Sequence, residues 1–170
     1  MRLLILGCGR VGATLANIMI KDGHEVTVID LNSEAFERLG SNFGGATIVG
    51  DGTDEDVLMR AGIEDTDAFA AVTNGDNRNI LAAQIAKHTF GVQKVICRIY
   101  DPIRQETYNA LGLESISPTV VGAKLIKTAL INDAPHTKSA VQSIAEGRPV
   151  PHATVPEKPL TTPAATGEKH

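Results

Sequence analysis

The 170-residue chain has no tryptophan, and aromatic residues make up only 4% of it. Proteins that bind single-stranded nucleic acid stack bases on aromatic side chains, so this scarcity argues against that function. The formal net charge is -4, so the chain has no general basic field that would attract a polyanion. Individual arginines can still bind phosphate groups inside a pocket. These absences argue against a nucleic-acid partner.

Cysteine is also scarce, and long apolar runs are missing. Cys8 and Cys97 form no pattern typical of a disulfide framework or a zinc knuckle, and they fit a reduced compartment. The apolar run at residues 3–6 is too short for the core of a signal sequence, and no stretch of about 20 apolar residues follows it. We therefore expect a cytoplasmic chain that does not span a membrane.

Short apolar runs alternate with helical patterns along the chain. The runs have the length and continuous apolar character of strands that are buried on both faces of a parallel sheet. They lie at residues 2–6, 25–29, 46–49, 68–72, 94–99 and 114–116. Helices are expected between them, with Ser33 and Thr53 as N-caps of the second and third, and with a last helix over residues 119–132. This alternation predicts an α/β fold with a doubly wound parallel sheet, the Rossmann architecture, in strand order 3-2-1-4-5-6.

The character of the sequence changes after the last predicted helix. Five of the 8 prolines lie between Pro149 and Pro163, and no aromatic residue follows Pro135. Such a composition cannot bury a core of its own. We predict one Rossmann domain over residues 1–134, which includes the last helix, and a flexible tail over residues 135–170.

Three glycines follow the first predicted strand, in the stretch LGCGRVGATLA. The spacing GxGxxG between a strand and a helix, with an acidic residue about 20 positions later, is typical of a dinucleotide-binding turn. Gly7 permits the turn, Gly9 lets a phosphate approach, Gly12 lets the helix pack closely, and Asp30 is the acid that binds a ribose. Because Asp30 would repel a 2′-phosphate, the pattern favours NAD or an adenosine phosphate over NADP. The alternative is that Asp30 merely caps a strand end.

Two arginines are candidates for binding phosphate. Arg10 lies inside the glycine turn, where dinucleotide enzymes usually carry small or apolar residues, and its guanidinium can make two hydrogen bonds to a terminal phosphate. Arg98 comes at the end of the fifth strand, on the ligand side of the predicted sheet. The alternatives are a solvent-exposed side chain for Arg10 and a structural ion pair for Arg98.

Polar loops after the third and fourth strands complete the candidate site. Asp51 is predicted to accept a hydrogen bond from the adenine amino group, or else to be an ordinary turn residue. Thr73, Asn74 and Asp76 are candidates for ribose or phosphate contacts, with a helix-capping role as the alternative. No catalytic residue and no metal ligand is predicted. The predicted binding residues are Gly7, Cys8, Gly9, Arg10, Val11, Gly12, Asp30, Leu31, Asp51, Gly52, Thr53, Thr73, Asn74 and Arg98.

The sequence shows no group suited to moving a proton beside a nicotinamide ring. Tyr100 and Tyr108 lack the lysine four residues later that short-chain dehydrogenases use, because Arg104 and Gly112 occupy those positions. A cofactor-binding domain without an accompanying catalytic domain predicts a sensor and not an enzyme. The alternative is the cofactor domain, or a fragment, of an NAD-dependent oxidoreductase.

Four stretches together resemble the N-terminal nucleotide-binding domain of the RCK (also called KTN) family, the Trk and Ktr type potassium-uptake regulators. They are LLILGCGRVGATLA, VTVIDLNSEAFERL, GDGTDEDVLMRAGIEDTDAFAAVTNGDNRNILAAQIAK and RIYDPIRQETYNALGLESISPT. The resemblance spans residues 1 to about 132. It implies a cytoplasmic regulatory subunit that binds ATP, ADP or NAD(H) and gates a membrane-embedded potassium transporter or channel.

The same resemblance implies an assembly. Members of this family form homodimers or larger rings, and their last helix crosses over to pack on the partner subunit. They usually continue into a small C-terminal ligand-binding domain, which is not recognisable here, so a separate chain of that type is a further expected partner. Through these partners the protein would be peripheral to the inner face of the membrane.

Overall fold

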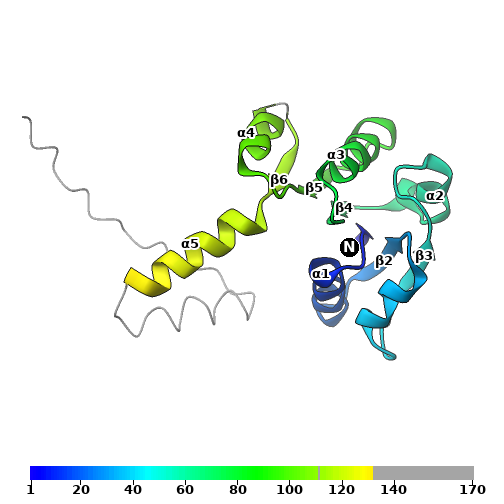
Figure 1. Cartoon of the computed structure of the whole chain (residues 1–170). Helices are drawn as coiled ribbons and strands as arrows, with labels where there is room; N and C mark the ends of the chain where they lie inside the picture. Colours follow the sequence, from blue (N-terminus) through cyan, green and yellow to red (C-terminus); the bar gives the residue numbers. More distant parts are fainter. Residues whose placement is uncertain (111, 132–170) are drawn as a thin grey trace, which may run out of the picture. The chain divides into compact units, whose positions relative to one another are not determined.

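The computed structural model describes residues 1–110 and 112–131, which form a twisted parallel sheet with helices on both faces (Figure 1). Over these residues the sheet has six strands in the order β3-β2-β1-β4-β5-β6, and every neighbouring pair is parallel. The predicted doubly wound Rossmann topology is confirmed. The strands are β1 (Arg2–Leu6), β2 (Glu25–Asp30), β3 (Ala46–Val49), β4 (Ala68–Ala71), β5 (Lys94–Arg98) and β6 (Glu114–Ile116).

Helical segments connect successive strands. The α-helices are α1 (Arg10–Lys21), α2 (Glu55–Arg60), α3 (Asp76–Gln84), α4 (Pro102–Ala110) and α5 (Pro118–Ile131). The segment after β2 is a 3-10 helix, η1 (Ser33–Leu39), a second short one, η2 (Ile63–Asp65), follows α2, and α3 continues into a π-helical segment, η3 (Ile85–Thr89). The predicted helices are therefore present between the strands, and the second is a tighter 3-10 helix.

Two hydrophobic clusters lie on opposite faces of the sheet. Successive side chains of a strand point to opposite faces, so β1 contributes to both clusters. Leu4 and Leu6 pack with α2 and α3, whereas Leu3 and Ile5 pack with α1 and η1. Burial on both faces explains why β1 reads as an uninterrupted apolar run in the sequence.

Residues Met1–Lys124 form one compact unit, and α5 continues from it into a second unit, Leu125–His170, of which residues 125–131 are described. The predicted tail, residues 135–170, and Asn132 at the end of the predicted last helix lie outside the described residues. Within the described part of the chain, no helix has the length and apolar character needed to cross a membrane.

Two predicted helix caps are wrong by one residue. Asn32, and not Ser33, caps η1, because its side chain accepts a hydrogen bond from the Glu34 N–H at 2.9 Å. Asp54, and not Thr53, caps α2 in the same way, accepting from the Asp56 N–H at 2.9 Å. Neighbouring residues that are all good caps compete for the role, and the sequence alone does not rank them.

The turn between β1 and α1 depends on two glycines. Gly7 has a φ of +103°, in a region that L side chains rarely adopt, and its N–H donates to the carbonyl oxygen of Ile29 at 2.7 Å. A Cβ atom on Gly12 would lie 1.8 Å from the carbonyl oxygen of Gly7. Because neither position accepts a side chain, the first turn of α1 packs directly against the carboxyl end of β1.

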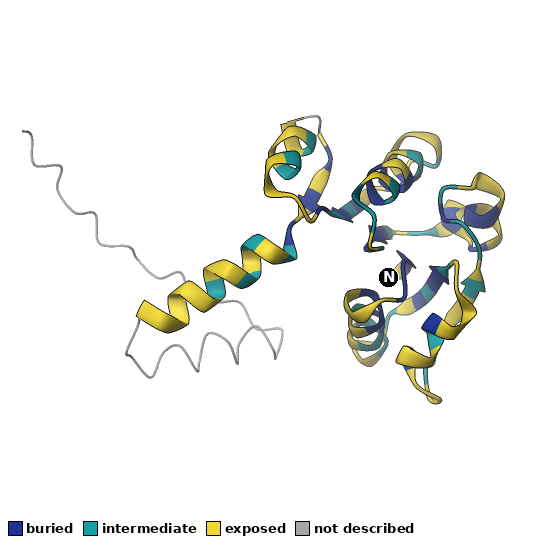
Figure 2. Cartoon of the chain, viewed as in Figure 1, coloured by how far each residue is buried: buried dark blue, intermediate teal, exposed yellow. Residues whose placement is uncertain are grey.

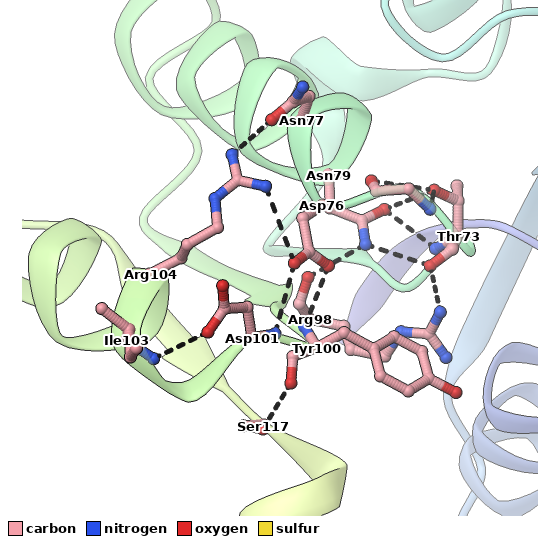
Figure 3. A network of polar contacts seen from close by, with 11 residues as sticks. Thr73, Asp76, Asn77, Asn79, Arg98, Tyr100, Asp101, Ile103, Arg104 and Ser117 are labelled. Carbon is pink, nitrogen blue, oxygen red and sulfur yellow. Dashed lines mark hydrogen bonds and ion pairs between the residues drawn. The ribbon is translucent and has the colours of Figure 1, made fainter.

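Asn79, in α3, joins the ends of β4 and β5 (Figure 3). Its side chain is fully buried. The amide oxygen accepts from the Thr73 N–H at 2.9 Å and from the Thr73 hydroxyl at 2.7 Å. The amide nitrogen donates to the carbonyl oxygens of Thr73, at 3.1 Å, and of Arg98, at 2.9 Å. One side chain thus fixes the loop after β4 against the last residue of β5.

We expect Gly12→Ala to lower the free energy of unfolding by about 3 kcal/mol or more, because the added methyl group overlaps a backbone oxygen that the sheet holds in place. The control is Gly122→Ala in α5, where an added Cβ meets nothing within 4 Å. That change should leave stability unaltered or raise it by up to about 1 kcal/mol. Urea unfolding followed by circular dichroism measures both, and a Gly12→Ala protein as stable as the wild type would contradict the account of the turn.

We expect Asn79→Ala to cost about 3–5 kcal/mol of stability, because it removes four hydrogen bonds and leaves backbone groups of Thr73 and Arg98 without partners. Asn74→Ala is the control, since Asn74 is exposed in the same loop, and it should change stability by less than about 0.5 kcal/mol. Thermal unfolding midpoints separate the two variants. Similar midpoints would show that the amide of Asn79 is not what holds this edge of the sheet.

Candidate nucleotide-binding site

A cavity of about 590 Å³ opens at the carboxyl ends of the central strands. β1 lies between β2 and β4 there, at the point where the strand order reverses, which is where open α/β sheets bind their ligands. The cavity is lined by Leu6, Gly7, Cys8, Gly9, Arg10, Val11, Asp30, Leu31, Asn32, Ala35, Arg38, Gly52, Val72, Thr73, Asn74, Arg78, Arg98, Tyr100 and Pro118.

Most of the predicted binding residues line this cavity, and three do not: Gly12, Asp51 and Thr53. Gly12 is buried beneath the turn, so it shapes the site without facing it. Asp51 and Thr53 bond to each other, because the Oδ1 atom of Asp51 accepts from the Thr53 N–H at 3.0 Å and from the Thr53 hydroxyl at 2.8 Å. Of this loop, Gly52 is the residue that reaches the cavity.

Those hydrogen bonds determine the ionisation of Asp51. The N–H and then the hydroxyl of Thr53 lower the pKa of the Asp51 carboxyl, partial burial opposes them, and the positive charge of Arg78 adds a smaller lowering. Asp51 is therefore an anion held in its own turn. The contribution of Arg78 indicates that its positive charge lies on the same side as the loop after β3.

Asp30 connects the glycine turn to the end of β2. Its Oδ2 atom accepts from the Cys8 N–H at 2.6 Å, and its Oδ1 atom accepts from the Asn32 N–H at 3.0 Å. These bonds fix the orientation of a carboxylate that lines the cavity. Each oxygen retains capacity for a further donor, which is what the two hydroxyls of a ribose would supply.

The N-terminus of α1 opens onto the cavity. Gly9 is the N-cap residue and offers no side chain to bond the first N–H groups, and the first turn holds no acidic residue. Free N–H groups and the positive end of the helix dipole at such a position attract phosphate. A Cβ on Gly9 would meet nothing within 4 Å, so the space beside the turn is open to a ligand.

Arg98 extends from the end of β5 along the cavity. Its guanidinium stacks on the ring of Tyr100, 4.6 Å from the centroid, and its Nη2 atom donates to the carbonyl oxygen of Thr73 (Figure 3). Its Nε atom is buried and has no hydrogen-bond partner among the described residues. A buried donor without an acceptor, at the wall of a cavity, fits an anionic ligand. The alternative prediction, a structural ion pair, finds no carboxylate partner among the described residues.

The structure adds cavity residues that the sequence analysis did not single out. Arg38 of η1 and Arg78 of α3 join Arg10 and Arg98, so that four arginines and one carboxylate, Asp30, line the cavity. Arg78 lies three residues after Gly75, the N-cap of a helix that follows the carboxyl end of β4. That position after a central strand is the signal that could have pointed to it.

Both cysteines are fully buried thiols. Burial raises the pKa of the Cys8 thiol, with a smaller contribution from the charge of Asp30 and an opposing one from Arg38. Burial likewise raises the pKa of the Cys97 thiol to about 11, with a smaller contribution from the negative charge of Asp76. Neither sulfur is ionised near neutral pH, so neither has the character of a nucleophile.

Two solved structures show the same fold. The AMP-bound form of the Kef CTD of Shewanella denitrificans has a TM-score of 0.66 at 18% identity, over 86% of this chain and 92% of that one. The GsuK channel bound to NAD has a TM-score of 0.60 at 20% identity, over 73% of this chain and 23% of that one. Identities this low show the fold alone.

Curated relatives are more similar in sequence. The Trk system potassium uptake protein TrkA of Streptomyces coelicolor is 51% identical over 117 residues, which are 69% of this chain and 52% of that protein. A TrkA homologue of Pyrococcus abyssi is 39% identical over 108 residues, 64% of this chain and 48% of its own length. The chain therefore spans about half the length of these two relatives.

The family match runs from the second residue of β1 past the end of β6 and includes every residue that lines the cavity. Residues 3–118 match the model of the TrkA-N domain. Together with the TrkA relatives, this match confirms the predicted family resemblance and favours it over the oxidoreductase alternative. The chain belongs to the TrkA-N domain family.

Proposed function

We propose that this chain is a nucleotide-sensing regulatory subunit of a potassium-uptake transporter or channel. The observation that carries the proposal is the cavity at the start of α1, where an uncapped helix N-terminus, an oriented carboxylate and four arginines meet. Membership of the TrkA-N family supports the potassium-transport role. Structural neighbours that hold AMP and NAD support an adenine nucleotide as the ligand.

The residues present fit ATP, ADP or NAD(H). The N-terminal N–H groups of α1 and the side chain of Arg10 would bind phosphate oxygens, and the free Nε of Arg98 would bind another. Asp30 would accept from the ribose hydroxyls. Leu31 and Gly52 would flank the adenine. The hydrogen bond from the adenine amino group to Asp51 stays a prediction, because Asp51 does not line the cavity and its Oδ1 atom accepts both bonds from Thr53.

We propose that regulation acts through an assembly of subunits, as a homodimer or a larger ring. Figure 2 shows that α5 is exposed along most of its length. Its exposed side chains include Val121, Ile126 and Leu130, and Leu130 is 80% exposed. Apolar side chains in such positions favour burial against another protein chain, in line with the predicted crossover helix. A separate chain with a C-terminal RCK-type domain is a further proposed partner.

Nucleotide binding would control transport by shifting the equilibrium between two subunit arrangements. A ligand shifts such an equilibrium only if it binds one arrangement more tightly than the other. Nucleotides that differ in phosphate number contact Arg10 differently, which would supply that difference. The protein would act in the cytoplasm, held at the inner face of the membrane by its transporter partner.

Potassium uptake tests this function. Deletion of the gene for this chain should reduce uptake at limiting external potassium, and the wild-type gene should restore it. We expect Arg10→Ala to leave uptake at the level of the deletion strain, because the terminal phosphate loses its arginine. The control is Arg60→Ala in α2, an exposed arginine outside the cavity, which should restore uptake fully.

Uptake is measured with rubidium as tracer in strains that contain equal amounts of each variant, as checked by immunoblot. Unchanged uptake after deletion would contradict the role in potassium transport. Full restoration by Arg10→Ala would contradict control through the nucleotide phosphates.

A further inference from the structure

Arg78 lines the cavity but has no role in the assignment given above. It lies in the first turn of α3, where Gly75 is the N-cap residue and provides no side-chain cap. The residue as a whole is partly buried, and its guanidinium nitrogens remain accessible. An accessible guanidinium is available to bind an anion when no carboxylate or carbonyl group pairs with it.

No such partner is present in the described residues. The Arg78 side chain makes no hydrogen bond and no salt bridge there. The positive charge of Arg78 contributes to lowering the pKa of the Asp51 carboxyl, but the two side chains form no salt bridge. Asp76, in the same helical turn, instead accepts from the Tyr100 N–H at 2.9 Å and lies 3.9 Å from Arg104 (Figure 3). The carboxylates around Arg78 therefore leave its donors available to a ligand.

The position of Arg78 is also unfavourable for a cation when the cavity holds no anion. The N-terminus of a helix carries the positive end of its dipole, which repels a positive side chain in the first turn. Arg10 has the same disadvantage as the first residue of α1. α1 packs on one face of the sheet and α3 on the other, and both arginines line the same cavity. An anion bound between the two helix N-termini would offset both repulsions.

The charge of the cavity selects among the nucleotides that fit it. Four arginines and one carboxylate line it, and that carboxylate, Asp30, accepts from the Cys8 and Asn32 N–H groups and is the proposed ribose ligand. The oxidised nicotinamide ring of NAD is a cation and would meet no lining carboxylate beside Arg78 and Arg98. Additional phosphate groups are anions and would meet unpaired guanidinium donors.

We infer that Arg78 is a specificity-determining residue that binds the outer phosphates of a nucleoside polyphosphate, so that affinity rises from AMP to ADP to ATP. This inference rests on the proposed nucleotide site and adds to it a residue and its role. Arg10 at the start of α1 and Arg78 at the start of α3 would together bind the outer phosphates, which is how the site would distinguish nucleotides by phosphate number.

Isothermal titration of the purified chain with AMP, ADP and ATP tests the inference in the wild type, Arg78→Gln and Arg78→Lys. We expect Arg78→Gln to weaken ATP binding about tenfold or more while changing AMP binding by less than about twofold. Arg78→Lys keeps the charge but loses the planar fork, so its ATP affinity should fall between the two. Arg60→Gln removes the same charge from α2, outside the cavity, and should bind all three nucleotides like the wild type.

Each outcome has one meaning. A wild-type chain that binds none of the three nucleotides would overturn the proposed function itself. A wild type that binds them, with ATP affinity unchanged in Arg78→Gln or with equal losses for AMP and ATP, would overturn the role of Arg78 and leave the proposed function intact. Ligand-free unfolding midpoints close to that of the wild type show that the variants fold, and a selective loss of ATP affinity in Arg78→Gln supports the inference.

Discussion

The contact between Gly12 and the carbonyl oxygen of Gly7 is the constraint on which the site depends. With no room for a Cβ between them, α1 begins where β1 ends, and the helix N-terminus opens at the carboxyl edge of the sheet. The same turn brings the Cys8 N–H to the carboxylate of Asp30, so the phosphate side and the ribose side of the cavity are fixed by one backbone geometry. A larger residue at Gly12 would separate α1 from the sheet and disrupt both the phosphate side and the ribose side of the cavity.

Asn79 has the matching role on the other half of the sheet. By satisfying the backbone of Thr73 and the last carbonyl of β5, it holds the loop after β4 and the side chain of Arg98 beside the cavity. The result is a site with two helix N-termini, at α1 and α3, on either side of an arginine-rich space. Preorganised donors of this kind cost little to align when a phosphate binds, and they allow phosphate number to bias a conformational equilibrium.

The sequence was sufficient for the topology because its signals are local. Apolar runs, the spacing of Gly7, Gly9 and Gly12, and an acid at the end of the second strand each report on one segment and its neighbour. Asn79 and Arg78 escaped notice because their importance comes from tertiary placement: both are ordinary polar residues of a helix until β5 and the cavity are positioned beside them. Asp51 shows the converse, since a residue predicted to face the ligand is bonded within its own turn.

The central claim is that the cavity binds an adenine nucleotide, and thermal unfolding of the purified chain with ATP, ADP, AMP, NAD, NADH and NADPH tests it most directly. A ligand present at about 100 times its dissociation constant stabilises a protein by about 2.7 kcal/mol, which for a chain of this size raises the unfolding midpoint by roughly 5–10 °C. The account predicts such a rise with ATP and ADP, and none with NADPH, whose 2′-phosphate meets the charge of Asp30. An unfolding midpoint that none of the six nucleotides raises would contradict it.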